Sequence, residues 1–247
     1  MAVLDNTKEF INYFKGDLMS NIFNEKMQDL DILFKKMGNM VSRTIDKAVM
    51  SFIAHDEKTS REIINRDHEI NDREAKIEKR TFEMIALYRP VSTDLREVVT
   101  ILKAVSILER MGDHARDIAQ STIRIHNRKQ SDKRIPKIER KISEMGFMAT
   151  KTVDRSLDAY VSDSVDQVSK ILKMYKEVSE LSSSIRENVL IYMRDNPNMI
   201  DTGGDYLYVI GFLKRTADQA TDIIEWLVYK HNGKIIDLNP GSSSFVD

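Results

Sequence analysis

An internal duplication constrains the fold of this chain more than any other feature of its sequence. The stretch LERMGDHARDI at 108–118 recurs at 213–223 as LKRTADQATDI. A second pair of matching segments, 37–47 and 145–155, occurs in the same order and with a similar spacing. Two matches in the same order indicate one structural unit repeated in tandem. The fold must therefore accommodate two similar halves that share an interface.

The composition predicts that each unit is helical. Helix breakers are rare, with nine Gly and four Pro in 247 residues, and charged residues make up 31% of the chain. Apolar or small residues recur three and four positions apart between residues 30 and 52, which is the spacing of a helix that packs along one side. The predicted helices cover about 5–54, 55–88, 90–127, 131–160, 164–194 and 205–231.

Three helices per unit bury their apolar faces best in a three-helix bundle. We therefore predict an all-α protein of two tandem three-helix bundles, at residues 1–129 and 130–238. The small and polar residues at 239–247 predict a flexible tail. Gly38 and Gly146 recur at matching points inside helices, where glycine costs about 1 kcal/mol relative to alanine. We expect helices to approach each other closely at both glycines.

Charge and composition argue against several classes of function. The net charge is −1 without a strongly basic block, so neither nucleic acid nor an anionic membrane is indicated as a bulk electrostatic partner. The absence of cysteine excludes disulfides and thiolate metal sites. No stretch approaches the roughly 18 apolar residues of a transmembrane helix, and the first residues lack a signal-peptide pattern. We expect a cytoplasmic protein that meets a membrane only through its partners.

Acidic residues in two predicted helices suggest a cation site in the first unit. Glu109, Asp113 and Asp117 are spaced four apart along the shoulder of the apolar row of their helix. Asp67 and Glu74 occupy apolar-type positions in the preceding helix. Partly buried carboxylates are costly unless they are paired or bind a metal, so this group needs a compensating positive charge.

Two sources can supply that positive charge. One is a salt-bridge network with nearby arginines, namely Arg66, Arg73, Arg110 and Arg116. The other is a hard cation that bridges the two helices, because oxygen-only ligands favour Mg, Ca, Mn or Fe. A histidine ligand would extend the choice to Zn or Ni. We expect His114 to be a surface or interface residue, because it points about 100° away from Asp113 around the helix.

The second unit keeps only part of this acidic pattern. Lys214 replaces the first acid and Gln219 replaces the histidine, whereas Asp218 and Asp222 remain. A lysine beside Asp218 supplies its own countercharge. We therefore predict at most a degraded second metal site at Asp218 and Asp222.

The joint order of several short motifs resembles the PhoU family of phosphate-uptake regulators over nearly the full length of the chain. The motifs are Met37-Gly38 with Asp46, Asp67 with Ile70-Asn71, Arg89-Pro90-Val91 with Asp94-Leu95-Arg96, the block 108–118, Tyr192-Met193 with Asp195 and Pro197, and 220–223 with Glu225-Trp226. The resemblance implies two tandem three-helix bundles, metal clusters held by the acidic motifs, frequent dimers and no catalytic activity.

The resemblance also implies the residues of the first metal site. Its ligands would be Glu109, Asp113, Asp117, Asp67, Asn71 and Glu74. The family usually has Asn where Asp117 stands here. Departures from the family motif at Lys214 and Gln219, with Lys176 near where an acid is expected, put a second cluster in doubt. They are consistent with a paralogue that serves a different phosphate transporter.

The implied function is non-enzymatic negative regulation of phosphate uptake and of phosphate-starvation signalling. The expected partners are a phosphate transporter and a sensor histidine kinase, the expected assembly is a homodimer, and the expected metal is Fe, Zn, Mg or Mn. Two alternatives stay open. One is a metal-free helical adaptor. The other is a carboxylate-bridged metalloenzyme, although the chain lacks the Glu-x-x-His pattern of di-iron bundles.

Overall fold

The structure is a computed structural model that describes residues 2–128 and 134–238, with side chains from residue 21 onward. Within these ranges the chain forms α-helices and two 3₁₀ turns and has no strand. The all-α prediction is therefore confirmed. The predicted tail at 239–247 and the predicted unit boundary at residue 129 lie outside the described residues.

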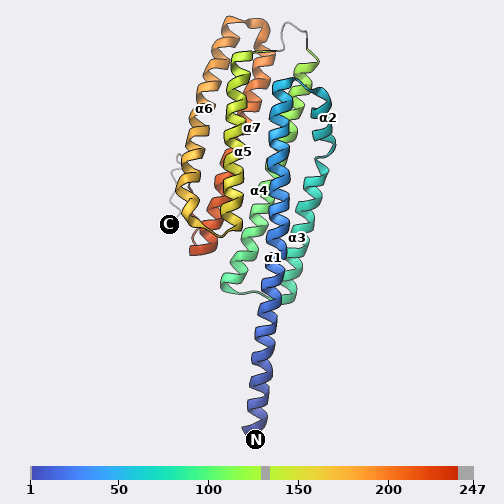
Figure 1. The fold of residues 1–247 in the computed structure, drawn as a ribbon, viewed down its shortest axis with the longest axis vertical. Coiled ribbons are helices and arrows are strands. Elements are labelled where there is room, and N and C mark those ends of the chain that lie inside the picture. Colours follow the sequence, from blue (N-terminus) through green and yellow to red (C-terminus); the bar gives the residue numbers. More distant parts are fainter. Residues whose placement is uncertain (1, 129–133, 239–247) are drawn as a thin grey trace.

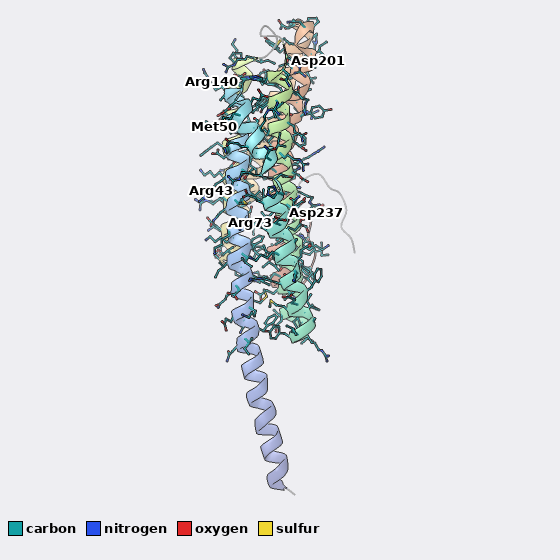
Figure 2. The ribbon with its side chains drawn as sticks, turned by 90° about the vertical axis from the view of Figure 1, so that its right-hand side faces the viewer. Arg43, Met50, Arg73, Arg140, Asp201 and Asp237 are labelled. Atoms are coloured by element: carbon teal, nitrogen blue, oxygen red, sulfur yellow. The ribbon has the colours of Figure 1, made fainter. Side chains whose placement is uncertain are left out.

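The helices run roughly along one long axis and pack side by side (Figure 1). The first repeat comprises α1 (Ala2–Ala54), α2 (Glu57–Asn65), α3 (His68–Tyr88) and α4 (Ser92–His126). The second repeat comprises α5 (Pro136–Val161), α6 (Val168–Asp195) and α7 (Ile200–Asn232). The first part of α1 extends past the end of the bundle (Figures 1 and 2). No helix in the described part of the chain is long and apolar enough to cross a membrane.

Two predicted boundaries differ from the structure. The second predicted helix is two helices, because α2 ends before Arg66 and α3 begins after Asp67. The last helix begins at Ile200, earlier than the predicted start near residue 205, so Gly203 and Gly204 lie inside α7. The side chain of Met193 packs where a Cβ of Gly203 would stand. The absence of a side chain at Gly203 therefore leaves room for Met193 and lets α6 pack closely on α7.

Helices α1 and α5 cross at the two matching glycines. A Cβ on Gly38 would lie 2.7 Å from Cδ1 of Leu157, and a Cβ on Gly146 would lie 2.6 Å from Cγ1 of Val49. Val49 and Leu157 are themselves matching positions, 108 residues apart. The close approach expected at both glycines is confirmed. The same contact between a glycine and an aliphatic side chain therefore occurs twice between α1 and α5, with the roles of the two repeats exchanged.

The buried residues also show which helices correspond. Positions 63, 70 and 77 are buried in α2 and α3, and positions 171, 178 and 185 are buried in α6, again 108 residues later. Helix α6 is therefore the counterpart of α2 and α3 together. One continuous apolar core runs through both repeats, and α4 and α7 pack against each other at its centre.

Buried ion pairs join the repeats at the end where α4 leads into α5. Glu139 of α5 is 3% exposed, and its Oε1 lies 2.9 Å from Nε2 of His55, which directly follows α1. The same oxygen accepts a hydrogen bond from Tyr206 of α7. Burial alone would raise its pKa, but hydrogen bonds from His55, Arg134 and Tyr206 lower the pKa of Glu139 to about 2. Asp205 of α7, also 3% exposed, is paired with Arg124 of α4 and with Arg128, two residues past the end of α4.

Candidate functional site

The acids of the first repeat meet around one arginine. Nη1 of Arg116 lies 3.0 Å from Oδ2 of Asp67 and 2.6 Å from Oδ1 of Asp113, so its guanidinium bridges α3 and α4. Nη2 of the same arginine is 3.5 Å from Oδ1 of Asp117. Asp67 makes no capping hydrogen bond with its own side chain at the start of α3, so its carboxylate is directed to the arginine. Of the four arginines considered from sequence, Arg116 is the one that pairs with these acids.

One guanidinium leaves this group of carboxylates with excess negative charge. Burial and then the charges of Asp113, Glu74 and Asp67 raise the pKa of Glu109. Burial also raises the pKa of Asp113, as do Asp67 and Asp117, although Arg116 opposes the shift. The pKa of Glu74 is raised by burial as well. These side chains are therefore close enough to repel one another.

The remaining predicted ligands lie around this group. Asn71 is exposed on α3, one turn after Asp67. Among the described residues, no set of three or more His, Asp or Glu side chains is arranged closely enough to hold a metal ion. We refer to Asp67, Glu109, Asp113 and Arg116 as the first acid row.

Two other basic residues near the first acid row have partners of their own. Arg66 pairs with Glu69 at 2.7 Å. His114 lies against α7, where its Nδ1 is 3.3 Å from Oγ1 of Thr216 and its ring centroid is 5.7 Å from that of Phe212. Burial, with the charges of Arg215 and Arg110, lowers the pKa of His114 to about 4. His114 is therefore a neutral residue of the contact between the repeats at neutral pH.

The second repeat replaces this arrangement with a lysine. Nζ of Lys214 donates to Asp218 and to the hydroxyl of Tyr175, 3.1 Å away, and lies 4.7 Å from the centre of the Tyr175 ring. Burial opposes it, but these two partners raise the pKa of Lys214. We refer to Tyr175, Lys214 and Asp218 as the second acid row.

The two rows occupy matching places. Tyr175 stands 108 positions after Asp67, and Lys214 stands 105 positions after Glu109. Sequence reasoning pointed instead to Lys176, which is exposed and lies 3.9 Å from Glu180. The offset of 108 between the repeats was the signal that would have identified Tyr175. Asp222, the other predicted ligand of a second site, is separate from this row and lines a cleft.

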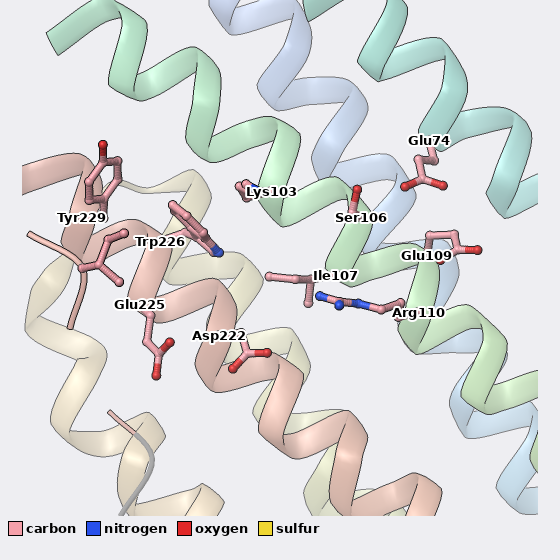
Figure 3. A pocket seen from close by; sticks show the side chains of 11 residues that line it. Glu74, Lys103, Ser106, Ile107, Glu109, Arg110, Asp222, Glu225, Trp226 and Tyr229 are labelled. Atoms are coloured by element: carbon pink, nitrogen blue, oxygen red, sulfur yellow. The ribbon is translucent and has the colours of Figure 1, made fainter. Parts of the chain in front are cut away.

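That cleft lies between α4 and α7 and has a volume of about 660 Å³. Glu74 and Glu109 line it from the first repeat, and Asp222 and Glu225 line it from the second. Figure 3 shows Arg110 pointing from α4 toward α7 among these carboxylates. The cleft therefore connects the acids of the two repeats, which the sequence did not reveal.

The α7 wall of the cleft is partly closed by the segment after α7. The backbone N–H of Leu238 donates to Oε1 of Glu225 at 2.8 Å. Burial, and then Asp222 and Asp237, raise the pKa of Glu225 to about 7, although the bond from Leu238 opposes them. Nζ of Lys103 lies 5.9 Å from the ring centre of Trp226 beside it. The cleft is thus lined by charges of both signs.

The first acid row has the donor chemistry for a hard cation, since its available donors are carboxylate oxygens. It could bind one only if Arg116 moved away from Asp67 and Asp113. The second acid row has one carboxylate, and that carboxylate is already neutralised by Lys214.

Comparison with known proteins gives a consistent result. The family model described as "PhoU domain" matches residues 34–122 and 142–227, one copy in each repeat. The "Phosphate-specific transport system accessory protein PhoU homolog" of Clostridium acetobutylicum is 32% identical over 219 residues, covering 88% of this chain and 98% of the relative. The protein with the same description from Streptococcus pneumoniae serotype 4 is 30% identical over 221 residues, and the match covers 90% of this chain and 100% of the relative.

Solved structures share the fold. The crystal structure of the phosphate transport system regulatory protein PhoU from Streptococcus pneumoniae superposes with a TM-score of 0.78 and 28% identity, covering 87% of this chain and 99% of the other. The crystal structure of PhoU from Pseudomonas aeruginosa gives a TM-score of 0.80 and 25% identity, and the match covers 86% of this chain and 100% of the other.

Proposed function

The chain belongs to the PhoU domain family, and from this membership we propose that it is a non-enzymatic regulator of phosphate uptake and phosphate-starvation signalling. In this proposal it acts in the cytoplasm, as a homodimer, through a phosphate transporter and a sensor histidine kinase. The observation that supports the proposal is the match of both repeats to the family over nearly the full length of relatives described as phosphate transport accessory proteins.

Deletion of the gene tests the regulatory role. In phosphate-rich medium, loss of a negative regulator is expected to raise expression of phosphate-starvation genes and to change phosphate uptake. Restoring the intact chain should return both to the starting level. Unchanged expression and uptake in the deletion strain would contradict the proposal.

We also propose that the first acid row binds a metal ion, with Fe, Zn, Mg or Mn as candidates. Asp67, Glu109 and Asp113 would hold it once Arg116 has moved away and these side chains have come closer together. Asp117, Asn71 and Glu74 are the further ligands implied by the family. The raised pKa values of Glu74, Glu109 and Asp113 support this proposal, because they reflect carboxylates that are partly buried and lie close to other acids. A bound metal would supply that charge and would join α3 to α4.

Metal analysis of the purified protein tests this site. The double variant Glu109→Ala with Asp113→Ala is expected to lose most of the bound metal. The matched double variant Asp218→Ala with Asp222→Ala alters the second repeat and should keep it. Equal metal content in both variants, or none in the unaltered protein, would contradict a metal site in the first repeat.

The position of Arg116 favours one second candidate, a metal-free helical adaptor. Its guanidinium already bridges Asp67 and Asp113, which is the place a metal would take. The same metal analysis separates the two candidates, because an adaptor would contain no metal yet would still alter phosphate-dependent expression when deleted.

A further inference from the structure

A pocket between α5 and α6 carries an excess of positive charge. It has a volume of about 230 Å³, and three basic side chains line it, those of Lys151, Arg155 and Lys170. Glu177 is its one acidic lining residue, and the rest of the wall is apolar. Lys151, Arg155 and Lys170 are exposed, and with one carboxylate beside them they give the pocket a net positive charge that attracts an anion.

The first repeat contains the matching pocket, and there the charge is balanced internally. Two basic side chains and three carboxylates line that pocket. Nζ of Lys47 donates to Oε2 of Glu62 at 3.0 Å, and Nε of Arg66 donates to Oε1 of Glu69 at 2.7 Å. Both basic residues are thus neutralised by acids of the same wall.

The offset of 108 residues identifies what changed between the two pockets. Arg155 corresponds to Lys47, but Lys170 stands where the first repeat has Glu62. An ion pair in one repeat has therefore become two positive charges in the other. Met174 replaces Arg66, so Glu177 lacks the arginine that pairs with its counterpart.

The basic side chains of the second pocket share it with Glu177 but are not ion-paired with that carboxylate. Within the described part of the chain, Lys151, Arg155 and Lys170 form no ion pair. Lys151 instead lies over the ring of Phe147, with Nζ 5.7 Å from the ring centre. That ring is 64% exposed at the edge of the pocket. The pocket thus combines unpaired cations with an exposed aromatic wall.

We propose that this pocket binds a phosphoryl-bearing anion. A phosphoryl group carries about two negative charges at neutral pH and three strong acceptor oxygens, which matches three basic residues opposed by one carboxylate. The planar guanidinium of Arg155 suits two such oxygens, whereas the lysines act as point charges. Phe147 and Met174 would contact an organic group attached to the phosphoryl group. The ligand is either a free phosphate compound or the headgroup of an anionic lipid.

This site is separate from the proposed regulatory and metal functions. None of its lining residues belongs to the first acid row or to the cleft between α4 and α7. Failure of the metal or gene-expression experiments would therefore leave the anion site untouched, and the reverse also holds.

Calorimetric titration of the full chain with inorganic pyrophosphate at low salt tests the free-ligand source. Lys170→Glu restores the charge pattern of the first repeat and is expected to weaken binding at least about tenfold. Lys137→Glu, an exposed change of the same charge at the far end of α5, is the matched control and should stay within about twofold. Glu177→Gln removes the opposing carboxylate and is expected to tighten binding about threefold, a gain that misfolding cannot produce.

Sedimentation with phosphatidylcholine vesicles, with and without phosphatidic acid, tests the lipid source. If the headgroup is the ligand, the chain binds only the vesicles that contain phosphatidic acid, and Lys170→Glu abolishes binding whereas Lys137→Glu does not. Binding in either experiment with this ranking of variants supports the proposal. Equal losses in Lys170→Glu and Lys137→Glu, or no binding of pyrophosphate and of either vesicle, would overturn it.

Discussion

The two acid rows occupy the same place in the two repeats but balance their charge differently. In the first, Arg116 bridges Asp67 and Asp113 across two helices, and Glu109 has no basic partner of its own in the row. In the second, Lys214 neutralises Asp218 and bonds the hydroxyl of Tyr175. The same backbone arrangement thus supports one row with surplus negative charge and another row in which Lys214 balances the charge of Asp218.

This difference shows how matching positions of a duplicated fold can carry different charges while the fold is kept. A lysine in place of an acid removes one negative charge and adds a positive charge that belongs to the chain itself. The remaining carboxylate then needs no bound cation. Replacing Asp67 by a tyrosine at position 175 removes a second carboxylate while keeping a hydrogen-bonding group. The second row is therefore balanced by a lysine of its own helix, whereas the first row contains more carboxylates than Arg116 balances.

Removing the internal cation of each row tests the comparison most strongly. Arg116→Met would leave Asp67, Asp113 and Asp117 facing one another and is expected to lower the free energy of unfolding by about 2 to 3 kcal/mol. Lys214→Met would leave one carboxylate beside a tyrosine and should cost about 1 to 2 kcal/mol. Urea unfolding at neutral pH measures both. Equal losses of unfolding free energy in the two variants would show that Arg116 and Lys214 stabilise their rows to the same extent, which would contradict the comparison.

The paired glycines of α1 and α5 give a somewhat smaller effect. Gly146→Ala would press against the stiff, β-branched Val49 and should cost about 1 to 2 kcal/mol. Gly38→Ala would press against the flexible end of Leu157, so the gain in helix propensity should offset most of the strain. Thermal unfolding of the two variants shows which substitution costs more stability.

A glycine without a neighbour provides the control for that pair. Nothing lies within 4 Å of a Cβ added to Gly211 in α7. Gly211→Ala should therefore stabilise the protein by up to about 1 kcal/mol. If Gly38→Ala and Gly146→Ala also stabilise it to this extent, the two helices do not cross as closely as described.

The smallest expected effect is the pH dependence of the first row. The pKa of Glu109 is raised in the fold by burial and neighbouring acids, so the folded chain binds its proton more tightly than the unfolded chain. Stability is therefore lost as the pH rises through that raised pKa. Glu109→Gln should stabilise the protein by less than about 1 kcal/mol near pH 8 and have no effect near pH 3.

The matched change in the second row has the opposite sign. Asp218→Asn removes the ion pair with Lys214 and should reduce stability near pH 8. Urea unfolding at both pH values compares the two variants. A loss of stability for Glu109→Gln near pH 8 would mean that this carboxylate is already well compensated.

The sequence by itself determined the helical class, the duplication and the close contact at Gly38 and Gly146. Helix periodicity and repeated motifs are local properties, so they can be counted along the chain. Helix periodicity also accounts for the buried positions Ile70 and Ile77 of α3, which are seven residues apart. It also identified the carboxylates that approach each other in the first row.

Only the tertiary structure decided how those carboxylates are balanced and where the repeats are joined. Arg116 was one of four candidate arginines, and its selection depends on the break between α2 and α3 that directs Asp67 toward α4. The pairing of His55 with Glu139 brings together residues 84 positions apart. Such contacts depend on how helices cross and on which side chains lose water there, and no spacing within one helix encodes either.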